Sequence, residues 1–150
     1  MRALVQRVSG ASVKIEGRLQ ASINAGILIF LGIEASDTRE DADWLARKLA
    51  ALRIFSDPDG KMNLSVWDVQ GSALVVSQFT LMASTKKGNR PSFVRAAPPE
   101  VATPLYDHFN ETLGSLIQSP VSTGIFGADM QVSLCNDGPV TLLLDSNNPE

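Results

Sequence analysis

The apolar run at residues 27–33, Ile-Leu-Ile-Phe-Leu-Gly-Ile, is the feature that most constrains the fold. An unbroken apolar run of this length is typical of a strand that is buried on both faces. Three shorter segments precede it, and we expect strands over 3–8, 12–16 and 20–23. Ser9-Gly10 should break the chain or bulge it between the first two of these strands. The N-terminal part of the chain therefore predicts a β-sheet.

Two later stretches have the periodicity of amphipathic helices. The first covers residues 38–52, behind the N-cap candidates Ser36-Asp37-Thr38. Its apolar residues recur at helical spacing: Ala42, Leu45, Ala46, Leu49 and Leu52. The second follows Pro98-Pro99-Glu100, and Thr103-Pro104 marks its expected effective start. Its apolar face consists of Ala102, Leu105, Phe109, Leu113, Leu116 and Ile117.

Composition and length narrow the class of protein. The 150 residues contain no repeat, linker or low-complexity tract, so we expect one domain over 1–150. A net charge of −3 argues against the whole surface binding nucleic acid. The single cysteine excludes an internal disulfide and fits a reducing compartment. No signal peptide or membrane-spanning run of about 18 apolar residues is visible, so we expect a cytoplasmic protein without membrane contact.

The C-terminal stretch combines two apolar runs with a rigid centre. Met130, Val132 and Leu134 alternate with polar residues, and 140–144 is a second short run that favours a strand. Asn136-Asp137-Gly138-Pro139 lies between them and is typical of a turn. We therefore predict a β-hairpin. The alternative is a backbone corner that proline holds rigid for a functional purpose, since proline sits badly at the start of a central strand.

Polar residues gather at the end of the predicted strand 73–81. Ser77, Gln78 and Thr80 follow the apolar residues of this strand. Strand alternation would direct Ser77, Phe79 and Leu81 to one face and Gln78 and Thr80 to the other. A strand that passes from the core to the rim would explain this pattern. The functional alternative is a row of hydroxyl, amide and backbone groups that line a pocket.

The segment 69–99 contains no aspartate or glutamate, although the chain as a whole is acidic. Its positive side chains are Lys86, Lys87, Arg90 and Arg95. Four cations in a loop of Gly, Asn, Pro and Ser are commonly a solvated surface. Phe93 lies among them and favours a contact with RNA or phosphate, because an aromatic ring can stack on a base.

The chain offers few groups for side-chain catalysis. One cysteine and one histidine cannot supply a metal-ligand cluster of the usual spacing. His108 is the only candidate base for a triad, and nothing in the sequence places it near Thr80. Cys135 is best interpreted as a buried structural cysteine. An enzyme with these parts would depend on backbone donors and on its substrate.

Four blocks of sequence, in this order, resemble the signature blocks of the D-aminoacyl-tRNA deacylase family, and the resemblance extends over the whole chain. Ser84 departs from the family pattern, which usually has aspartate there. The blocks are Ser77-Gln78-Phe79-Thr80-Leu81, Lys87-Gly88-Asn89-Arg90-Pro91-Ser92-Phe93, Thr123-Gly124-Ile125-Phe126-Gly127-Ala128-Asp129-Met130 and Asn136-Asp137-Gly138-Pro139-Val140-Thr141.

The resemblance implies an α/β fold, with a mixed, largely antiparallel, barrel-like sheet and two main helices packed on it. It implies a hydrolase that cleaves the ester between a D-amino acid, or mischarged glycine, and the 3′-terminal adenosine of tRNA. Neither a cofactor nor a metal is implied. The implied assembly is a homodimer in which a cis Gly138-Pro139 peptide reaches into the partner's pocket.

The resemblance also assigns roles to individual residues. Those at the reacting ester are Ser77, Gln78, Phe79 and Thr80. Those that select the substrate's chirality are Gly138, Pro139, Met130, Phe126 and Asn136. The positive charge of 69–99, which has no compensating acid there, leads us to expect tRNA binding by Lys86, Lys87, Arg90 and Arg95. Thr80 has been viewed as a nucleophile, but we favour assistance by the 2′-OH of the tRNA and a positioned water. Two alternatives remain open, a non-catalytic nucleic-acid-binding module and an esterase that acts through Thr80 on small esters.

Overall fold

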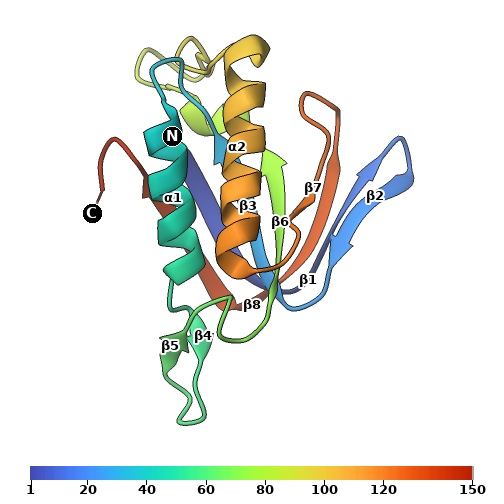
Figure 1. Ribbon diagram of the computed structural model, residues 1–150. Coiled ribbons are helices and arrows are strands. Elements are labelled where there is room, and N and C mark those ends of the chain that lie inside the picture. The colour runs from blue at the N-terminus through green and yellow to red at the C-terminus, as the bar shows by residue number, and fades with distance from the viewer. Residues whose placement is uncertain (150) are drawn as a thin grey trace.

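The computed structural model describes residues 1–149 as a curled, barrel-like β-sheet with two helices on one face (Figure 1). The six strands of this sheet are β1 (Arg2–Ile15), β2 (Arg18–Ile23), β3 (Gly26–Gly32), β6 (Ser72–Ser77), β7 (Ser122–Thr123) and β8 (Gln131–Asp145). The helices are α1 (Arg39–Ala51) and α2 (Pro99–Ile117). A small separate hairpin consists of β4 (Phe55–Ser56) and β5 (Met62–Leu64). The α/β class that was expected is confirmed.

Strand β1 organises the sheet because it pairs on both of its edges. One edge pairs antiparallel with β3 in its first half and with β2 in its second half. The other edge pairs antiparallel with β8 along almost its whole length. Parallel pairing occurs only between β3 and β6 and between β6 and β7 among the residues described. The sheet is therefore mixed and largely antiparallel, as expected.

The first strand is longer than the sequence suggested. We expected separate strands over 3–8 and 12–16, but β1 is continuous from Arg2 to Ile15. Its pairing with β8 shifts register between Gln6 and Val8 and again between Val8 and Gly10. Bulges of this kind bend a strand and increase its twist without ending it. Ser9-Gly10 therefore marks a bend in β1 that lets the sheet curl.

The predicted C-terminal hairpin is wrong. Residues 131–145 form the single strand β8, and both halves of this strand run antiparallel to β1. Residues 131–135 pair with 10–14, and residues 141–145 pair with 2–6. Asn136-Asp137-Gly138-Pro139 therefore interrupts one ladder and does not reverse the chain. A turn signal in the sequence cannot distinguish a reversal from a bulge, because the partner strand lies far away in the sequence.

Both helices match their predicted ranges closely. Helix α1 begins after Thr38, whose backbone N–H and hydroxyl both donate to the Asp41 carboxylate at 2.9 Å. Helix α2 begins at Pro99, so Pro104 lies inside it and does not mark its start. Neither of these helices is long and apolar enough to cross a membrane, nor is any other in the described part of the chain.

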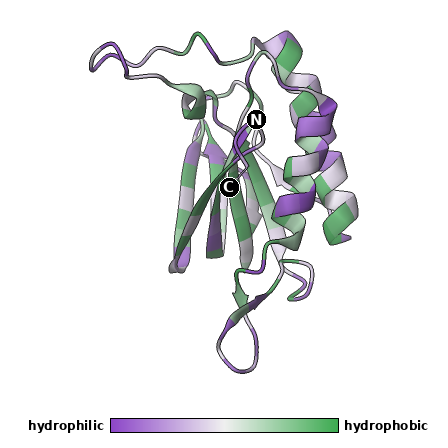
Figure 2. Cartoon of the chain, turned by 90° about the vertical axis from the view of Figure 1, so that its left-hand side faces the viewer, coloured by the Kyte–Doolittle hydropathy of each residue, from purple (hydrophilic) through white to green (hydrophobic). Residues whose placement is uncertain are grey.

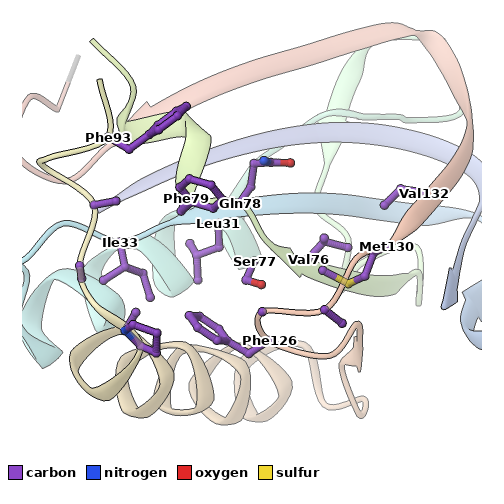
Figure 3. A pocket seen from close by; sticks show the side chains of 16 residues that line it. Leu31, Ile33, Val76, Ser77, Gln78, Phe79, Phe93, Phe126, Met130 and Val132 are labelled. Carbon is purple, nitrogen blue, oxygen red and sulfur yellow. The ribbon is translucent and has the colours of Figure 1, made fainter. Parts of the chain in front are cut away.

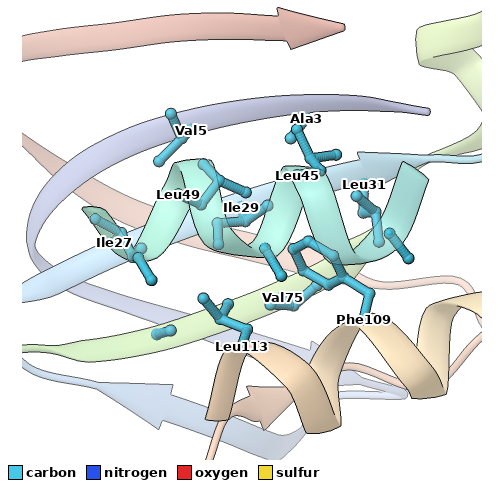
Figure 4. Packing of buried hydrophobic residues seen from close by; sticks show 14 of the residues in the cluster. Ala3, Val5, Ile27, Ile29, Leu31, Leu45, Leu49, Val75, Phe109 and Leu113 are labelled. Atoms are coloured by element: carbon cyan, nitrogen blue, oxygen red, sulfur yellow. The ribbon is translucent and has the colours of Figure 1, made fainter. Parts of the chain in front are cut away.

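The core lies in two layers on either side of the sheet. Leu45 and Leu49 of α1 and Phe109 and Leu113 of α2 pack on the face that the helices cover (Figure 4). A second cluster fills the inside of the curl: Val8, Ala11, Val13, Ile23, Leu28, Leu74 and Val76. Strand β3 contributes to both layers, because Ile27, Ile29 and Leu31 belong to the first and Leu28 to the second. The prediction of a strand buried on both faces is confirmed.

Replacement of Phe109 by alanine tests the helix–sheet layer. The Phe109 side chain is 0% exposed, so Phe109→Ala should lower the free energy of unfolding by about 3–5 kcal/mol. The measurement is urea denaturation followed by circular dichroism. Leu19→Ala is the control, because Leu19 is 61% exposed and its loss should change stability by no more than about 0.5 kcal/mol. Equal effects of the two changes would contradict this account of the core.

Candidate active site

The polar strand end is a turn of 3-10 helix and not a continuation of the strand. Strand β6 ends at Ser77, and residues Phe79–Met82 form the 3-10 helix η1. The Gln78 N–H donates to the Leu31 carbonyl at 2.8 Å, and beyond this bond the chain leaves the sheet. The predicted alternation of side chains over 77–81 is therefore wrong. The β-propensity of residues 78–81 favours a strand, but no strand within residues 1–149 pairs with them.

A cavity of about 440 Å³ opens beside this turn (Figure 3). Its walls come from the end of β6, the start of η1, the N-terminal turn of α2 and the segment that leads into β8. It brings together five of the residues that the resemblance places at the ester or in chiral selection: Ser77, Gln78, Phe79, Phe126 and Met130. The other lining residues are mostly apolar, among them Leu31, Ile33 and Val132. A small, largely apolar cavity with a few polar groups at one end is the usual form of a ligand site.

Thr80 lies outside the cavity lining and is solvent-exposed. The Gln78 side-chain amide donates a hydrogen bond to the Thr80 hydroxyl oxygen. His108 is not near it, because the His108 Nε2 atom lies 2.7 Å from a carboxylate oxygen of Asp43, where α1 and α2 meet. The hydrogen bond with His108 is the largest of the influences that lower the pKa of Asp43. His108 therefore joins two helices and does not serve as a base for Thr80.

Two backbone donors lie beside the cavity, at the start of η1. The N–H groups of Phe79 and Thr80 lie at the start of η1, where a helix has no internal acceptor for them. Neither N–H has an acceptor among residues 1–149. No group of three or more His, Cys, Asp or Glu side chains in that range could hold a metal ion. The site can therefore offer hydrogen bonds to a substrate oxygen.

Cys135 lies on the surface of β8, so the expectation of a buried structural cysteine is wrong. Met130 and Val132 are half-buried, as the predicted alternation requires, but Leu134 is exposed, because β8 is an edge strand. Within residues 1–149 it pairs with β1 alone, so many of its side chains face solvent. Cys135 is also absent from the cavity lining.

Met130 depends on a glycine that the sequence analysis did not single out. Gly124 is buried beneath the Met130 side chain, and a Cβ atom at position 124 would lie 2.4 Å from the Met130 sulfur. Real Cβ contacts do not occur at this distance, so any side chain at 124 would displace the thioether. Gly124 therefore sets where Met130 lines the cavity.

Phe126 is held by a buried tyrosine. The rings of Tyr106 and Phe126 meet edge to face, with centroids 5.8 Å apart. The Tyr106 hydroxyl donates to the Val75 carbonyl at 2.8 Å, and burial raises the pKa of Tyr106 to about 12. The phenol is therefore neutral near pH 7 and acts as a fixed donor rather than a base.

Gly138-Pro139 is a cis peptide on the exposed side of β8, and neither residue lines this cavity. Gly138 has a φ of +149°, a conformation that side chains disfavour. The guanidinium of Arg7 holds the bend at Gly138-Pro139, which we call the corner, in place. Its Nε donates to the Asp137 carbonyl at 2.7 Å and its Nη1 to the Ile54 carbonyl at 2.5 Å. No local pattern marks Arg7 in the sequence.

Asn136 spans the interruption in β8 with its side chain. Its amide oxygen accepts from the Val140 N–H at 2.7 Å. Its amide nitrogen donates to the Val140 carbonyl at 3.1 Å and to the Thr141 hydroxyl at 3.0 Å. These bonds replace ladder bonds that the bulge removes. Asn136 therefore supports the corner, and like Gly138 and Pro139 it does not line the cavity.

The predicted tRNA-binding cations lie in two environments. Lys86, Lys87 and Arg90 are exposed in the loop 84–92, which we call the basic loop. Two hydrogen bonds of 2.9 Å between the backbones of Ser84 and Ser92 close its neck. Arg95 lies outside this neck and pairs with Glu34. Residues 69–99 contain no Asp or Glu, but Glu34 from another segment forms an ion pair with Arg95, one of the four cations.

Loss of the Asn136 side chain should destabilise the protein measurably. Asn136→Ala leaves the N–H of buried Val140 without its acceptor, which costs about 1–3 kcal/mol in the free energy of unfolding. Urea denaturation measures this cost. Asn24→Ala is the control, because Asn24 is exposed and should change stability by less than about 0.5 kcal/mol. An Asn136→Ala variant with the same free energy of unfolding as the parent would show that the side chain does not support the corner.

Comparison with known proteins gives consistent results. The family model described as D-Tyr-tRNA(Tyr) deacylase matches residues 4–145. A protein of Akkermansia muciniphila named D-aminoacyl-tRNA deacylase is 62% identical over 150 residues, which is 100% of both chains. A protein of the same name from Flavobacterium johnsoniae is 55% identical over the same length, again 100% of both chains.

Two solved structures are similar in fold. One, described as c-Myc DNA Unwinding Element Binding Protein, has a TM-score of 0.92 at 44% identity, over 97% of this chain and 98% of that one. The other, described as a probable eukaryotic D-amino acid tRNA deacylase, has a TM-score of 0.81 over 95% of this chain and 97% of that one. Its 17% identity supports a likeness of fold alone.

Proposed function

The chain belongs to the D-Tyr-tRNA deacylase family, and on this premise we propose that it hydrolyses the ester bond of D-aminoacyl-tRNA. The products are free tRNA and a D-amino acid, and we include mischarged glycyl-tRNA among the substrates. The observation that carries the proposal is 62% identity over the whole chain to a protein of that name. We further propose that residues 1–150 form one deacylase domain, which the family match over 4–145 supports. A cytoplasmic location follows from where charged tRNA is made and used.

The reaction we propose uses the substrate and the backbone of η1. Water attacks the ester carbonyl carbon, the bond to the ribose 3′-oxygen breaks, and the proton lost by the water ends on that oxygen. The tRNA 2′-OH relays this proton. The N–H groups of Phe79 and Thr80 stabilise the oxyanion, since neither has an acceptor within residues 1–149. No cofactor is required for these steps.

Ser77 and Gln78 have supporting roles in this proposal. Ser77 lines the cavity where β6 ends, and its hydroxyl is available to the bound ester. Gln78 donates its amide to the Thr80 oxygen, which leaves the Thr80 hydroxyl proton free to donate to the substrate. The described part of the chain places no base beside Thr80, so we do not assign Thr80 as the nucleophile.

Phe126 and Met130 receive the amino-acid side chain in this proposal, because both line the apolar part of the cavity. Selection against L-amino acids falls to Gly138-Pro139 of a second subunit. The exposure of this peptide on an edge strand supports the assignment, as does its absence from the cavity of its own subunit. Lys86, Lys87 and Arg90 are our proposed phosphate contacts, because they are exposed on one loop.

A deacylation assay tests the activity. We expect release of the amino acid from D-tyrosyl-tRNA and not from L-tyrosyl-tRNA. A D-tyrosyl-tRNA ending in 2′-deoxyadenosine should react slower by about a hundredfold or more, because the proton relay is lost. Thr80→Ala should keep measurable activity. A covalent aminoacyl adduct on Thr80 would contradict the mechanism.

The same assay separates the two alternatives. A nucleic-acid-binding module would bind tRNA without releasing the amino acid. The similar solved structure described as c-Myc DNA Unwinding Element Binding Protein is the reason to test this alternative. A threonine esterase would hydrolyse small esters such as p-nitrophenyl acetate and lose that activity in Thr80→Ala. Either result would overturn the proposed function.

We propose a homodimer that uses the sheet face without helices. Figure 2 shows both helices on one side of the sheet and no helix on the opposite side. Leu143 is 62% exposed on β8, and its register partners Leu4 on β1 and Phe30 on β3 are half-buried on the same face. An apolar row of this kind on a sheet face and at its edge favours association.

Introducing a charge into this row should separate the subunits. Leu143→Glu would bury an unpaired carboxylate in the interface, so we expect the dimer to become a monomer in sedimentation equilibrium. Leu19→Glu is the control, because Leu19 is similarly exposed but lies on β2. A parent protein that is already monomeric at micromolar concentration would contradict the dimer.

A further inference from the structure

The stretch that follows the basic loop is attached to the end of β3. The Ala35 N–H donates to the Arg95 carbonyl at 3.3 Å, and the Ala97 N–H donates to the Ile33 carbonyl at 2.9 Å. Glu34 and Ala96 form an isolated antiparallel bridge at the same place. Residues 93–97, which we call the pocket wall, therefore run beside 33–35. Two backbone hydrogen bonds alone would leave this short pairing weak, since they make a single isolated bridge.

A two-pronged ion pair reinforces this pairing. Arg95 Nε and Nη2 each lie 2.8 Å from one of the two oxygens of the Glu34 carboxylate. The Glu34 side chain is 18% exposed and the Arg95 side chain 50% exposed. Planar guanidinium and carboxylate groups match in this geometry, which fixes their relative orientation as well as their distance. The Nε/Nη2 edge, one of the two guanidinium edges that could make a two-pronged contact with a phosphate, is thus occupied by Glu34.

The pair remains ionised over the range in which enzymes usually work. Hydrogen bonding from Arg95 is the largest influence on Glu34 and lowers the pKa of its carboxyl below the usual value of 4.5. The same contact raises the pKa of Arg95 above its usual value. A carboxyl with a lowered pKa contributes stability above its unfolded-state pKa and loses it as the pH falls through the lowered value. Near neutral pH the pair is complete.

The pocket wall itself lines the cavity. Phe93, Ala96 and Ala97 are lining residues, and so is Ile33 on the facing segment. The Phe93 ring meets the Phe79 ring edge to face, with centroids 5.1 Å apart and planes at 71° (Figure 3). Phe79 begins the turn η1, whose N–H groups are the proposed oxyanion donors. The Glu34–Arg95 pair therefore lies directly behind a wall that touches the reacting end of the cavity.

We propose that Arg95 is a positioning residue which, through Glu34, fixes the pocket wall and the base of the basic loop, and is not a phosphate contact. This inference rests on the proposed function for its kinetic test. The proposal gives the four cations two different roles. Lys86, Lys87 and Arg90 bind RNA, whereas Arg95 links the position of the basic loop to the position of the cavity wall. Displacement of groups around a reacting centre by about 1 Å can cost about a hundredfold in rate.

Removing the acid instead of the base distinguishes the two roles. Glu34→Gln keeps the positive charge of Arg95 and frees its guanidinium. If Arg95 positions the wall, Glu34→Gln and Arg95→Gln should both lower kcat on D-tyrosyl-tRNA, each by about tenfold or more. If Arg95 binds phosphate, Glu34→Gln should keep kcat and tighten binding, and only Arg95→Gln should be impaired. This second pattern would overturn the proposal.

The salt dependence of tRNA binding gives an independent comparison. Each lost phosphate contact should change the slope of log K against log salt by about 0.7–0.9. Lys87→Gln should show this change, whereas Arg95→Gln should leave the slope as in the parent. Lys61→Gln is the matched control, because Lys61 is exposed on the β4–β5 hairpin at the opposite end of the molecule from the basic loop (Figure 1). A slope for Arg95→Gln equal to that for Lys87→Gln would also refute the positioning role.

Hydrogen exchange tests the inference without any activity. The amides of Ala35 and Ala97 should exchange at least about tenfold faster in Glu34→Gln and Arg95→Gln, and at the parent rate in Lys87→Gln and Lys61→Gln. The double variant Glu34→Arg with Arg95→Glu should recover part of this protection. If the parent released no amino acid, the proposed function would fail while the exchange result still decided the role of Arg95. Unchanged exchange in both Gln variants would overturn the inference.

Discussion

The antiparallel pairing of β1 with β8 is the constraint on which the rest of the structure depends. Both strands are long, and a shift of one residue in their register would turn every side chain of β8 to the other face. This register places Met130, just before β8, at the cavity and directs the bulge at Gly138-Pro139 to the surface. It also brings Asp145 to Arg2, whose guanidinium donates to Asp145 at 2.8 Å and to the Leu81 carbonyl of η1 at 3.1 Å. One ladder thus positions both the Gly138-Pro139 corner and the turn η1.

The site that results depends on backbone position more than on acid–base side chains. Tyr106 is buried as a neutral donor and His108 pairs with Asp43 between the helices, so neither supplies a base at η1. Fixed N–H groups in an apolar surrounding stabilise developing negative charge without reorganising during the reaction. Such a site needs accurate placement of the main chain. Gly124, which sets the place of Met130, and the Asn136 bonds across the bulge both fix the main chain in this way.

Local periodicity predicted most elements, whereas long-range pairing decided the rest. The two helices and the buried strand β3 could be predicted because burial pattern and chain period agree there. The end of β6 at Ser77, the continuity of β8 and the exposure of Cys135 depend on which strands lie alongside, and no window of sequence contains that information. Five of the lining residues, Ser77, Gln78, Phe79, Phe126 and Met130, were expected from the family resemblance. The supports Arg7 and Glu34 were missed, because each acts on a segment far away in the chain.

Selectivity between mirror-image amino acids sets how rigid these supports must be. A thousandfold preference for D over L requires about 4 kcal/mol of differential free energy. A cavity that accepts many side chains cannot obtain this from the side-chain contacts, since the two enantiomers carry the same side chain. This difference in free energy must come from rigid groups around the α-carbon that clash with the L enantiomer. A wall free to shift by a fraction of an ångström would relieve the clash and lose the preference. Under the proposed function, the bidentate Glu34–Arg95 pair and the Asn136 bonds would bear on specificity as well as on stability, because each limits how far a wall or corner can move.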